Sequence, residues 1–580
     1  MKGLTPRIVS CIKGYDKETF AKDLMAGIIV GIVALPLAIA FGIASGVTPE
    51  KGIITAIVAG FIISLLGGTK VQIGGPTGAF IVIIYGIVTN PEYGLQGLLI
   101  ATMLAGVILV ALGAFRLGAV IKFIPYPIII GFTAGIAVTI FTTQIGDILG
   151  LTQETVSAAG ETIRVPLKTP GDFIGKWICY FRNIGTFNPW NFVVAMGSLL
   201  VIIFSPKVLS KVKGLNKIPG SLYGIILGTV AVALLKNYLG AEGIDTIGDR
   251  FQIQAQLPEM VVPTITFELI QKLMPVAFTI AILGAIESLL SAAVADGVIS
   301  DRHDSNMELV AQGVANMVAP LFGGIPATGA IARTMTNINN GGRTPVAGII
   351  HAVVLLLILL VLMPLAKYIP MATLAAVLVI VSYNMSGWRT FRGLLKNPKS
   401  DVTVLLITFF LTVIFDLTIA IEIGLVIACA LFIKRVMETT EISVIKDEID
   451  PSDEADMNVG DEHLSIPQGC AVYEINGPYF FGIANKFDDL MASMDTMQLP
   501  RVQIIRMRKV PFIDSTGIHN LANLIEMNHE KNIHVILSGV TPKVHSQLEK
   551  AGFYEKMNPD HICPHIDIAL SKANELLANG

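Results

Sequence analysis

Charged residues are scarce in this chain. Of its 580 residues only 15% are Asp, Glu, Lys or Arg, whereas 53% are hydrophobic, and the formal net charge is −3. Soluble domains carry about 25% charged residues, so this composition excludes an ordinary soluble protein and indicates a membrane protein. The near-neutral charge balance gives no reason to expect nucleic acid or an acidic macromolecule as a partner.

Cysteine is also rare, and its spacing excludes two further classes of protein. The five residues fit neither a metal site nor a disulfide framework, so we expect no metal and no cofactor. They are Cys11, Cys179, Cys429, Cys470 and Cys563. No cleavable signal is expected, because the first apolar run follows a charged stretch and continues into further membrane segments.

Long apolar runs dominate the first three quarters of the chain. Several are shorter than the ~20 residues that cross a bilayer, most plainly those that begin at Gly75-Pro76 and at Pro326. We expect these two to be half-helices whose exposed backbone is buried in protein or lines a cavity. The spans fall near 24–45, 52–67, 76–89, 94–114, 124–146, 190–205 and 220–239, then near 272–295, 307–321, 327–338, 345–364, 370–384, 401–415 and 418–438.

The two sets of seven spans repeat each other. IASGV at 43–47 returns as VADGV at 294–298, and TGA at 77–79 returns at 328–330, both at an offset of 251 residues. KFIP at 122–125 returns as KYIP at 367–370. A repeat with an odd number of spans enters the membrane from the opposite side, so the repeats are inverted. Inverted repeats with Gly and Pro breaks at matching places are typical of secondary transporters.

The distribution of basic residues predicts the orientation. Lys51 and Lys367 are the few short-loop cations on one side of the alternating spans, and the opposite side, which is cytoplasmic by the positive-inside rule, carries many more. Both termini are then cytoplasmic, in a membrane of the bacterial inner (plasma) membrane type. The cations on the cytoplasmic side are Lys70, Arg116, Lys122, Lys207, Lys211, Lys213, Lys217, Arg343, Arg389, Arg392, Lys396 and Lys399.

The composition changes abruptly near residue 440. An acidic stretch, 447–461, precedes a pattern of strands at 470–475, 501–507 and 533–539 and helices at 487–494 and 517–527, which predicts a small α/β domain. Within it, FIDSTG at 512–517 places Asp514, Ser515 and Thr516 between a strand and a helix. A helix N-cap is the simplest interpretation of these three residues.

The chain resembles the sulfate permease (SulP) family of anion transporters, and its tail resembles the STAS domain of that family. The matching segments are DLMAGIIVGIVALPLAIA at 23–40, GGPTGAF at 74–80, FIPYPIIIGFTAG at 123–135, ELVAQGVAN at 308–316, GGIPATGAIARTMTN at 323–337 and FIDSTG at 512–517. The resemblance implies seven-plus-seven inverted repeats with a core and a gate domain, a substrate site between the two half-helices, and a homodimer.

The expected domains follow from this resemblance and from the change in composition. They are a cytoplasmic N-terminus at 1–22, a transmembrane domain at 23–438 with repeats at about 23–239 and 270–438, a linker at 439–465 and a STAS domain at 466–580.

The residues around the half-helices explain why such a site would take an anion. Each helix N-terminus presents unpaired N–H groups and about half a positive charge. Glycines allow close approach of the backbone, and Thr77 and Thr328 can add hydroxyl donors. Alternatively, the threonines only cap helices and the glycines only allow close packing. The predicted substrate-binding residues are Gly75, Pro76, Thr77, Gly78, Ala327, Thr328, Gly329 and Ala330.

Glu287 is the predicted proton carrier. It lies within an apolar span, where a carboxylate is costly and usually functional, and where the protonated form is favoured. A bound anion would favour protonation further, so proton and anion would move together. The alternative is a structural carboxylate bonded to a neighbouring helix.

Three secondary residues bear on the substrate and the coupling ion. Pro36 is followed by Leu37, where many members of the family have glutamine, so a possible amide contact is missing. Ser291 keeps sodium coupling open, although Ile331 replaces a polar ligand that sodium-coupled bicarbonate members carry. Arg333 either balances Glu287 or stabilises the cytoplasmic mouth. His351 is expected to be a hydrogen-bonded structural histidine rather than a proton relay.

The predicted function is therefore not enzymatic. We expect proton-coupled uptake of sulfate or a similar small anion, with a C4-dicarboxylate/proton symporter or a sodium-coupled bicarbonate transporter as alternatives. An anion channel or a membrane sensor fits less well, because the predicted site is a closed pocket between broken helices.

Overall fold

The chain forms two compact units, Met1–Val426 and Ile427–Gly580. The computed structural model describes residues 4–12, 14–119, 125–156, 162–170, 172–209, 219–252, 260, 262–415, parts of 423–437, and 441–445, 448–449, 464–481 and 500–578. Three of the four residues of KFIP, four of the cytoplasmic lysines (Lys122, Lys211, Lys213 and Lys217) and most of the last predicted span lie outside these residues.

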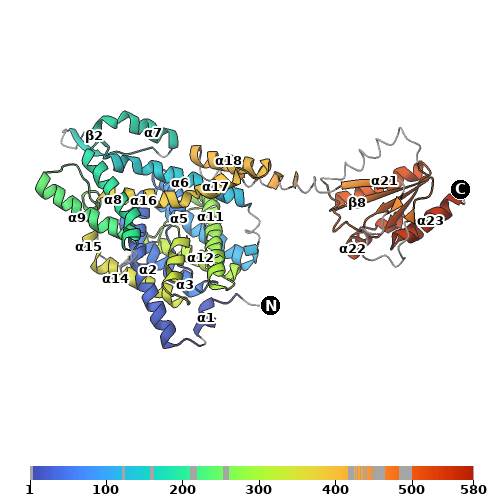
Figure 1. Ribbon diagram of the computed structural model, residues 1–580, viewed down its shortest axis with the longest axis horizontal. Coiled ribbons are helices and arrows are strands. Elements are labelled where there is room, and N and C mark those ends of the chain that lie inside the picture. The colour runs from blue at the N-terminus through green and yellow to red at the C-terminus, as the bar shows by residue number, and fades with distance from the viewer. Residues whose placement is uncertain are drawn as a thin grey trace. The chain divides into compact units, whose positions relative to one another are not determined.

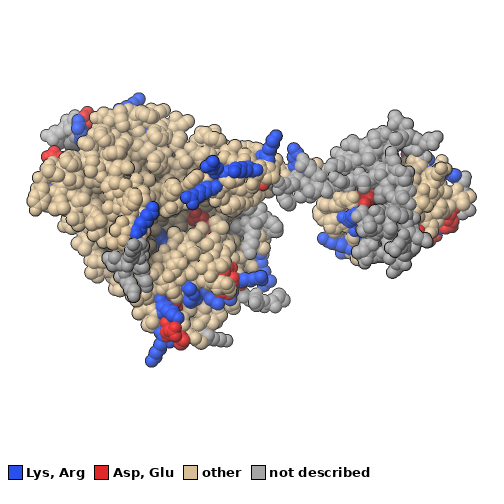
Figure 2. Space-filling view, in the orientation of Figure 1, with Lys and Arg blue, Asp and Glu red and all other residues tan. Residues whose placement is uncertain are grey.

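The first unit is helical and poor in surface charge (Figure 1 and Figure 2). Among the described residues, eight helical segments are long and apolar enough to cross a membrane. They are α2 (Lys17–Ala44), α3 (Pro49–Leu66), α5 (Gly94–Ala114), α6 (Tyr126–Leu149), α8 (Pro189–Val208), α9 (Gly220–Leu239), α11 (Phe267–Ile299) and the run Met371–Leu394, which comprises α16 (Met371–Ser386) and α17 (Trp388–Leu394).

The helices of this unit pack as two groups. The core group consists of α2, α3, α5 and α11 with α4 (Ile81–Val88), α12 (Ser305–Val318), α13 (Ile331–Asn339) and α14 (Val346–Val361). The gate group consists of α6, α8, α9 and α16 with α18 (Lys399–Ile414), and α7 (Phe173–Arg182) packs on α6 and α18. Short elements complete the unit: α1 (Arg7–Ile12), α10 (Ile247–Arg250), α15 (Met363–Ala366) and the hairpin β2 (Thr152–Val156) and β3 (Thr162–Pro166).

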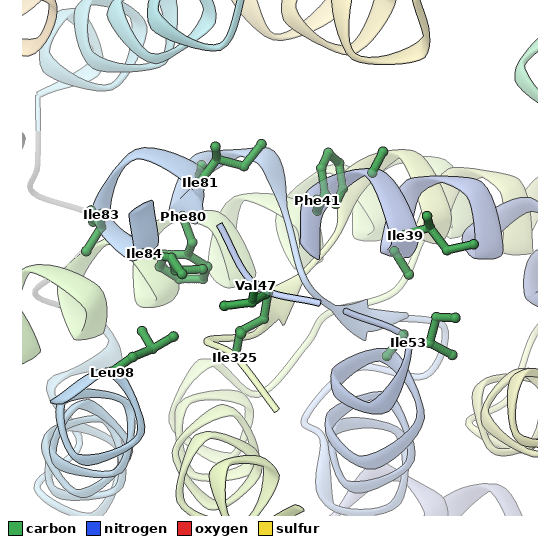
Figure 3. Packing of buried hydrophobic residues seen from close by; sticks show 14 of the residues in the cluster. Ile39, Phe41, Val47, Ile53, Phe80, Ile81, Ile83, Ile84, Leu98 and Ile325 are labelled. Atoms are coloured by element: carbon green, nitrogen blue, oxygen red, sulfur yellow. The ribbon is translucent and has the colours of Figure 1, made fainter. Parts of the chain in front are cut away.

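Two extended segments cross inside the core group. Strand β1 (Gly74–Gly75) pairs antiparallel with β4 (Thr328–Gly329), in the register Gly74 to Gly329 and Gly75 to Thr328. Apolar side chains from both segments and their neighbours, including Val47, Phe80 and Ile325, belong to one buried cluster around the crossing (Figure 3). The two fragments identified as repeats in the sequence therefore meet in space.

A short helix follows each extended segment. A 3-10 turn at Gly78–Phe80 leads into α4, close to the predicted start at Pro76. The second helix, α13, begins only at Ile331, five residues after Pro326, where a half-helix was expected to start. Pairing with β1 and a bond from the Ala330 N–H to the Ile73 carbonyl oxygen (2.9 Å) hold the intervening residues extended.

Glu308 holds one of the crossing segments from the side. This fully buried carboxylate on α12 accepts bonds from Gly68 N (2.9 Å), Thr69 Oγ1 (3.0 Å), Gln72 Nε2 (2.8 Å) and Gln312 Nε2 (2.9 Å). Four donors occupy its lone pairs, so the ionised form is fully satisfied and no proton is needed.

Asn316, two turns later on α12, holds the other segment. Its side chain donates to the Ala327 carbonyl oxygen at 2.8 Å and accepts from the Ala327 N–H at 2.9 Å. The Ile325 N–H donates to Thr55 Oγ1 at 2.7 Å. Side chains thus replace the hydrogen bonds that the extended backbone cannot make with itself.

The second unit is an α/β domain, as predicted. Strands β8 (Cys470–Asn476), β9 (Val502–Arg506), β10 (His534–Ser538) and β11 (Ile562–Cys563) run parallel, and β5 (Glu441–Ile445) pairs antiparallel with β8. Strand β5 lies within the segment 439–465 that was expected to be a linker, and β6 (Glu448–Ile449) and β7 (Leu464–Ser465) form a separate pair there.

Three helices complete the second unit, and FIDSTG begins one of them. Helices α21 (Ser515–Glu530) and α22 (Pro542–Lys550) pack in one buried cluster, and α23 (Ile566–Ala578) packs in another. Asp514 caps α21, accepting from the Gly517 N–H at 2.8 Å, which confirms the N-cap interpretation. The helix expected at 487–494 lies outside the described residues.

We predict that Glu308→Gln destabilises the transmembrane unit by roughly 3 kcal/mol, because the new NH2 group would face donors instead of accepting from them. The check is the thermal midpoint for loss of monodisperse protein in detergent. Glu18→Gln is the control, since Glu18 forms only an exposed pair with Lys22. Equal midpoints for the two variants would contradict the role given to Glu308.

Candidate anion-binding site

One turn of α11 contacts both crossing segments. Thr77 Oγ1 donates to Glu287 Oε2 at 2.9 Å, at the start of the first half-helix. Ser288 Oγ lies 2.5 Å from Thr328 Oγ1 and accepts from the Gly329 N–H at 3.1 Å, and Thr328 Oγ1 donates to the Gly284 carbonyl oxygen at 3.0 Å. Gly284, Glu287 and Ser288 lie on one helical face at i, i+3 and i+4, so a single turn positions the whole crossing.

Glu287 is half-buried, with one hydrogen-bond donor at its carboxylate. Glu308, in contrast, is fully buried with four donors. A carboxylate with one donor can gain a proton without losing a bond, whereas one with four donors cannot. Of these two acids of the core group, Glu287 is the one whose hydrogen bonds leave room for a proton.

Most of the donors predicted in the second segment are already used. The N–H groups of Ala327, Gly329 and Ala330 bond to Asn316, Ser288 and Ile73, and the hydroxyl hydrogen of Thr328 goes to Gly284. These residues therefore shape the crossing. An added Cβ at Gly329 would collide with Gln72, so a bulky residue there would disturb the Glu308 network as well as any binding.

The accessible donors of the second half-helix lie slightly further along the chain. Helix α13 begins at Ile331, and Ile331 and Ala332 are exposed. The first amides of a helix have no acceptor within it. The sequence predicts these amides at 327–330, because a helix that begins at Pro326 would have its first N–H groups there. The repeat itself contained the better signal, since TGA at 77–79 immediately precedes Phe80 and the start of α4.

The first half-helix faces the gate group at its start. An added Cβ at Gly78 would lie 2.7 Å from Met385 Sδ on α16 and 3.4 Å from Ile140 Cδ1 on α6. Thr77, beside Gly78, is half-buried and holds Glu287. The site therefore has a polar wall from the core group and an apolar wall from the gate group.

Arg333 is buried behind the crossing. It lies in the first turn of α13, rather than two turns in, and only 1% of it is exposed. Its Nη2 donates to the Pro76 carbonyl oxygen at 2.8 Å, and an added Cβ at Gly75 would collide with its Nη1. Arg333 forms no ion pair with Glu287 and lies at no exposed mouth, so neither predicted role fits. It supplies a buried positive charge next to Gly75 and Pro76.

The remaining predicted residues lie close to this arrangement. Ser291 is buried and donates weakly to Thr334 Oγ1 at 3.4 Å, so its hydroxyl is directed at α13. Pro36 is buried within α2. His351 is fully buried, and neither of its ring nitrogens has a hydrogen-bond partner among the described residues, contrary to the expected bonded histidine.

Comparison with known proteins confirms the resemblance seen in the sequence. A model of the Sulfate permease family matches residues 20–408, and a model of the STAS domain matches residues 463–569. A Bacillus subtilis protein named “Putative sulfate transporter YvdB” is 41% identical over 564 residues, which cover 96% of this chain and 98% of that protein.

Two further relatives support the class and the fold. The bicarbonate transporter BicA of a Picosynechococcus species is 29% identical over 563 residues, covering 95% of this chain and 94% of BicA. The structure of the murine Solute Carrier 26 family member A9 anion transporter has a TM-score of 0.84 at 20% identity, covering 99% of this chain and 94% of that one. The predicted helical membrane fold with a C-terminal STAS domain is confirmed, and the relatives are transporters.

We predict that Gly78→Ala slows anion exchange by about tenfold. The added Cβ would lie too close to Met385 and would destabilise the packing of the core group against the gate group by about 1–2 kcal/mol. Exchange of labelled anion in proteoliposomes measures this. Gly86→Ala on the same half-helix is the control, since its Cβ would meet nothing within 4 Å. Met385→Ala should restore exchange in the Gly78→Ala protein, and failure of that rescue would argue against the contact.

Proposed function

This chain is a member of the sulfate permease family of anion transporters, and we propose that it couples proton entry to the uptake of sulfate or a similar small anion by alternating access. The bond from Thr77 to Glu287, at the start of the first half-helix, is the observation that carries the proposal. It places a carboxylate that can accept a proton beside helix N–H groups that can donate to an anion.

Anion binding rests on the two helix starts. The half-helices α4 and α13 both begin at the crossing, and each contributes unpaired amides and about half a positive charge. The buried guanidinium of Arg333, bonded to Pro76, adds a charge that no carboxylate of the described residues neutralises. Together these groups favour an anion over a cation or a neutral solute.

Proton coupling rests on the charge of Glu287. Ionised Glu287 repels an incoming anion, and a proton removes this repulsion. The bond from Thr77 persists in either state, because a protonated carboxyl group still has an oxygen that accepts. Anion and proton then occupy the site together and leave together, which is the thermodynamic requirement for symport.

Alternating access rests on the separation of core and gate. The site is built on the core group, and the gate group closes it with apolar contacts from Met385 and Ile140 at Gly78. Apolar contacts of this kind carry no directional bonds, so at Gly78 the core could slide past the gate without breaking a hydrogen bond.

Sulfate is favoured by the relative at 41% identity, and bicarbonate by BicA. Sodium coupling is less well supported, because the Ser291 hydroxyl is buried against Thr334. The C4-dicarboxylate symporter stays the third candidate. We further propose a homodimer with cytoplasmic termini in a bacterial-type inner membrane, which cross-linking in membranes tests.

The substrate is tested by competition. Purified protein in proteoliposomes, with an inward proton gradient and the membrane potential clamped at zero, is given labelled sulfate with unlabelled sulfate, bicarbonate, oxalate, succinate or fumarate. Sulfate should compete best. Stronger competition by succinate, or uptake that follows a sodium gradient, would replace the proposed substrate or coupling ion. Uptake that persists without residues 440–580 would argue against a sensor, and uncoupled anion current would indicate a channel.

We predict that Glu287→Gln abolishes accumulation driven by a proton gradient but keeps anion counterflow. The variant imitates the protonated carboxyl group and still accepts from Thr77. A gradient of one pH unit supplies about 1.4 kcal/mol per proton, enough for about tenfold accumulation, and this factor should fall to one. Full proton-driven accumulation in the variant would end the assignment. Reduced yield with intact coupling would instead indicate a structural carboxylate.

A further inference from the structure

Helix α7 exposes its apolar face and buries its polar face. Its apolar residues Ile174, Ile178 and Phe181 are 58%, 58% and 70% exposed, at positions i, i+4 and i+7 of one helical face. The opposite face carries Lys176, which is 2% exposed, and Tyr180, which is also buried. A helix on a water-exposed surface would bury these apolar side chains and expose the polar ones. The exposed face of α7 is therefore not suited to contact with water.

The exposed face of α7 fits the lipid of its own membrane. In the chain, α7 lies between the end of α6 at Leu149 and the start of α8 at Pro189 (Figure 1). The Asn188 N–H donates to the Leu149 carbonyl oxygen at 2.9 Å, so these two apolar helices have neighbouring ends. Exposed apolar residues continue from α7 into Phe187, Phe192 and Val193 at the start of α8. A continuous apolar surface at a boundary, with Trp177 beside it, is typical of a helix that lies in the interface.

The buried face of α7 joins the gate group to the first half-helix. Tyr180 donates to the Thr142 carbonyl oxygen on α6 at 2.9 Å, which fixes α7 to the gate. Lys176 Nζ lies 5.5 Å from the ring centroid of Tyr85, and Tyr85 donates to the Thr169 carbonyl oxygen at 3.0 Å. Tyr85 belongs to α4, the half-helix that carries the site at its other end.

Lys176 has no ordinary partner in this position. None of the described carboxylates forms an ion pair with it. Burial lowers the pKa of Lys176 to about 8, and Asp172 acts weakly in the opposite direction. The close contact that the structure gives the ammonium group is therefore with the ring of Tyr85, whose face attracts a cation.

We propose that α7 is an interfacial membrane helix that clamps the end of half-helix α4 distant from the site, through Lys176 and Tyr85. The clamp rests on the proposed alternating access, because α4 belongs to the core group and α7 moves with the gate. The clamp therefore stabilises the present arrangement of core and gate and must open when the core moves.

The lipid face is tested with a fluorophore at Ile178. Ile178→Cys, in a chain whose five cysteines are replaced, is labelled with an environment-sensitive dye and reconstituted into phosphatidylglycerol–phosphatidylethanolamine vesicles. Quenching by lipids that carry a spin label near the headgroup, with protection from aqueous iodide, is expected. Quenching by iodide alone would overturn the proposal. Lys168→Cys, at an exposed lysine preceding α7, is the aqueous control.

The clamp is tested with matched lysine variants. Lys176→Met keeps the length of the side chain and removes its charge, Lys176→Arg keeps the charge, and Tyr85→Phe removes only the bond to Thr169. Val88→Cys at the end of α4 reports opening through its rate of labelling by a membrane-impermeant maleimide. Labelling should rise about fivefold in Lys176→Met, less in Tyr85→Phe, and stay unchanged in Lys176→Arg and in Lys168→Met.

This result is distinguishable from a failure of the proposed function. Lys176→Met should change the rate of anion exchange while the accumulation per unit of proton gradient is kept, whereas Glu287→Gln changes the accumulation and keeps exchange. Unchanged labelling in both Lys176→Met and Tyr85→Phe would overturn the clamp, whatever the outcome for Glu287. The proposal needs both faces of α7, so failure of either experiment overturns it.

Discussion

The crossing of two extended segments inside a membrane domain is the constraint on which the rest of this structure depends. Extended backbone cannot satisfy its own hydrogen bonds, and lipid offers none. The two-residue pairing of Gly74-Gly75 with Thr328-Gly329 uses some of these groups. Polar side chains on α11 and α12 accept hydrogen bonds from other backbone N–H groups. The main acceptors are Glu308, Asn316 and Ser288. Two half-helices can therefore begin at mid-domain, with free amides at their starts.

Two glutamates, Glu308 and Glu287, contact this crossing, and they differ in the number of hydrogen bonds that they accept. Glu308 accepts four bonds, three of which hold Gly68, Thr69 and Gln72 in place. Glu287 accepts one bond, from a threonine that also begins a half-helix. The same type of side chain thus has all its lone pairs occupied at Glu308, whereas the carboxylate of Glu287 has room for the proton that the proposed function assigns to it. Burial differs in the same sense, since Glu308 is fully buried and Glu287 only half-buried.

The sequence predicted the elements that repeat or follow a periodicity. The duplication located both half-helices, and alternation located β8, β9 and β10. It failed where long-range contacts override local signals. Pro326 marks an extended segment because β1 pairs with the residues after it, so α13 begins at Ile331. No local pattern predicts the role of Glu308, because three of its four hydrogen-bond donors come from residues 236 to 240 positions away. No local pattern shows that Arg333 is buried beside Pro76.

Helix α4 lies between two contacts, that of Thr77 with Glu287 and that of Tyr85 with Lys176. Thr77, at its start, holds Glu287, and Tyr85, near its end, contacts Lys176 of the gate-bound α7. Eight residues of helix span about 12 Å, and a helix this short is stiff. In the proposed mechanism, a shift of the core group would move both ends of this short helix together. It would change the surroundings of Glu287 and withdraw Tyr85 from Lys176 and Thr169. The proposed proton site and the proposed clamp would then act on the same rigid element, although no side chain connects them.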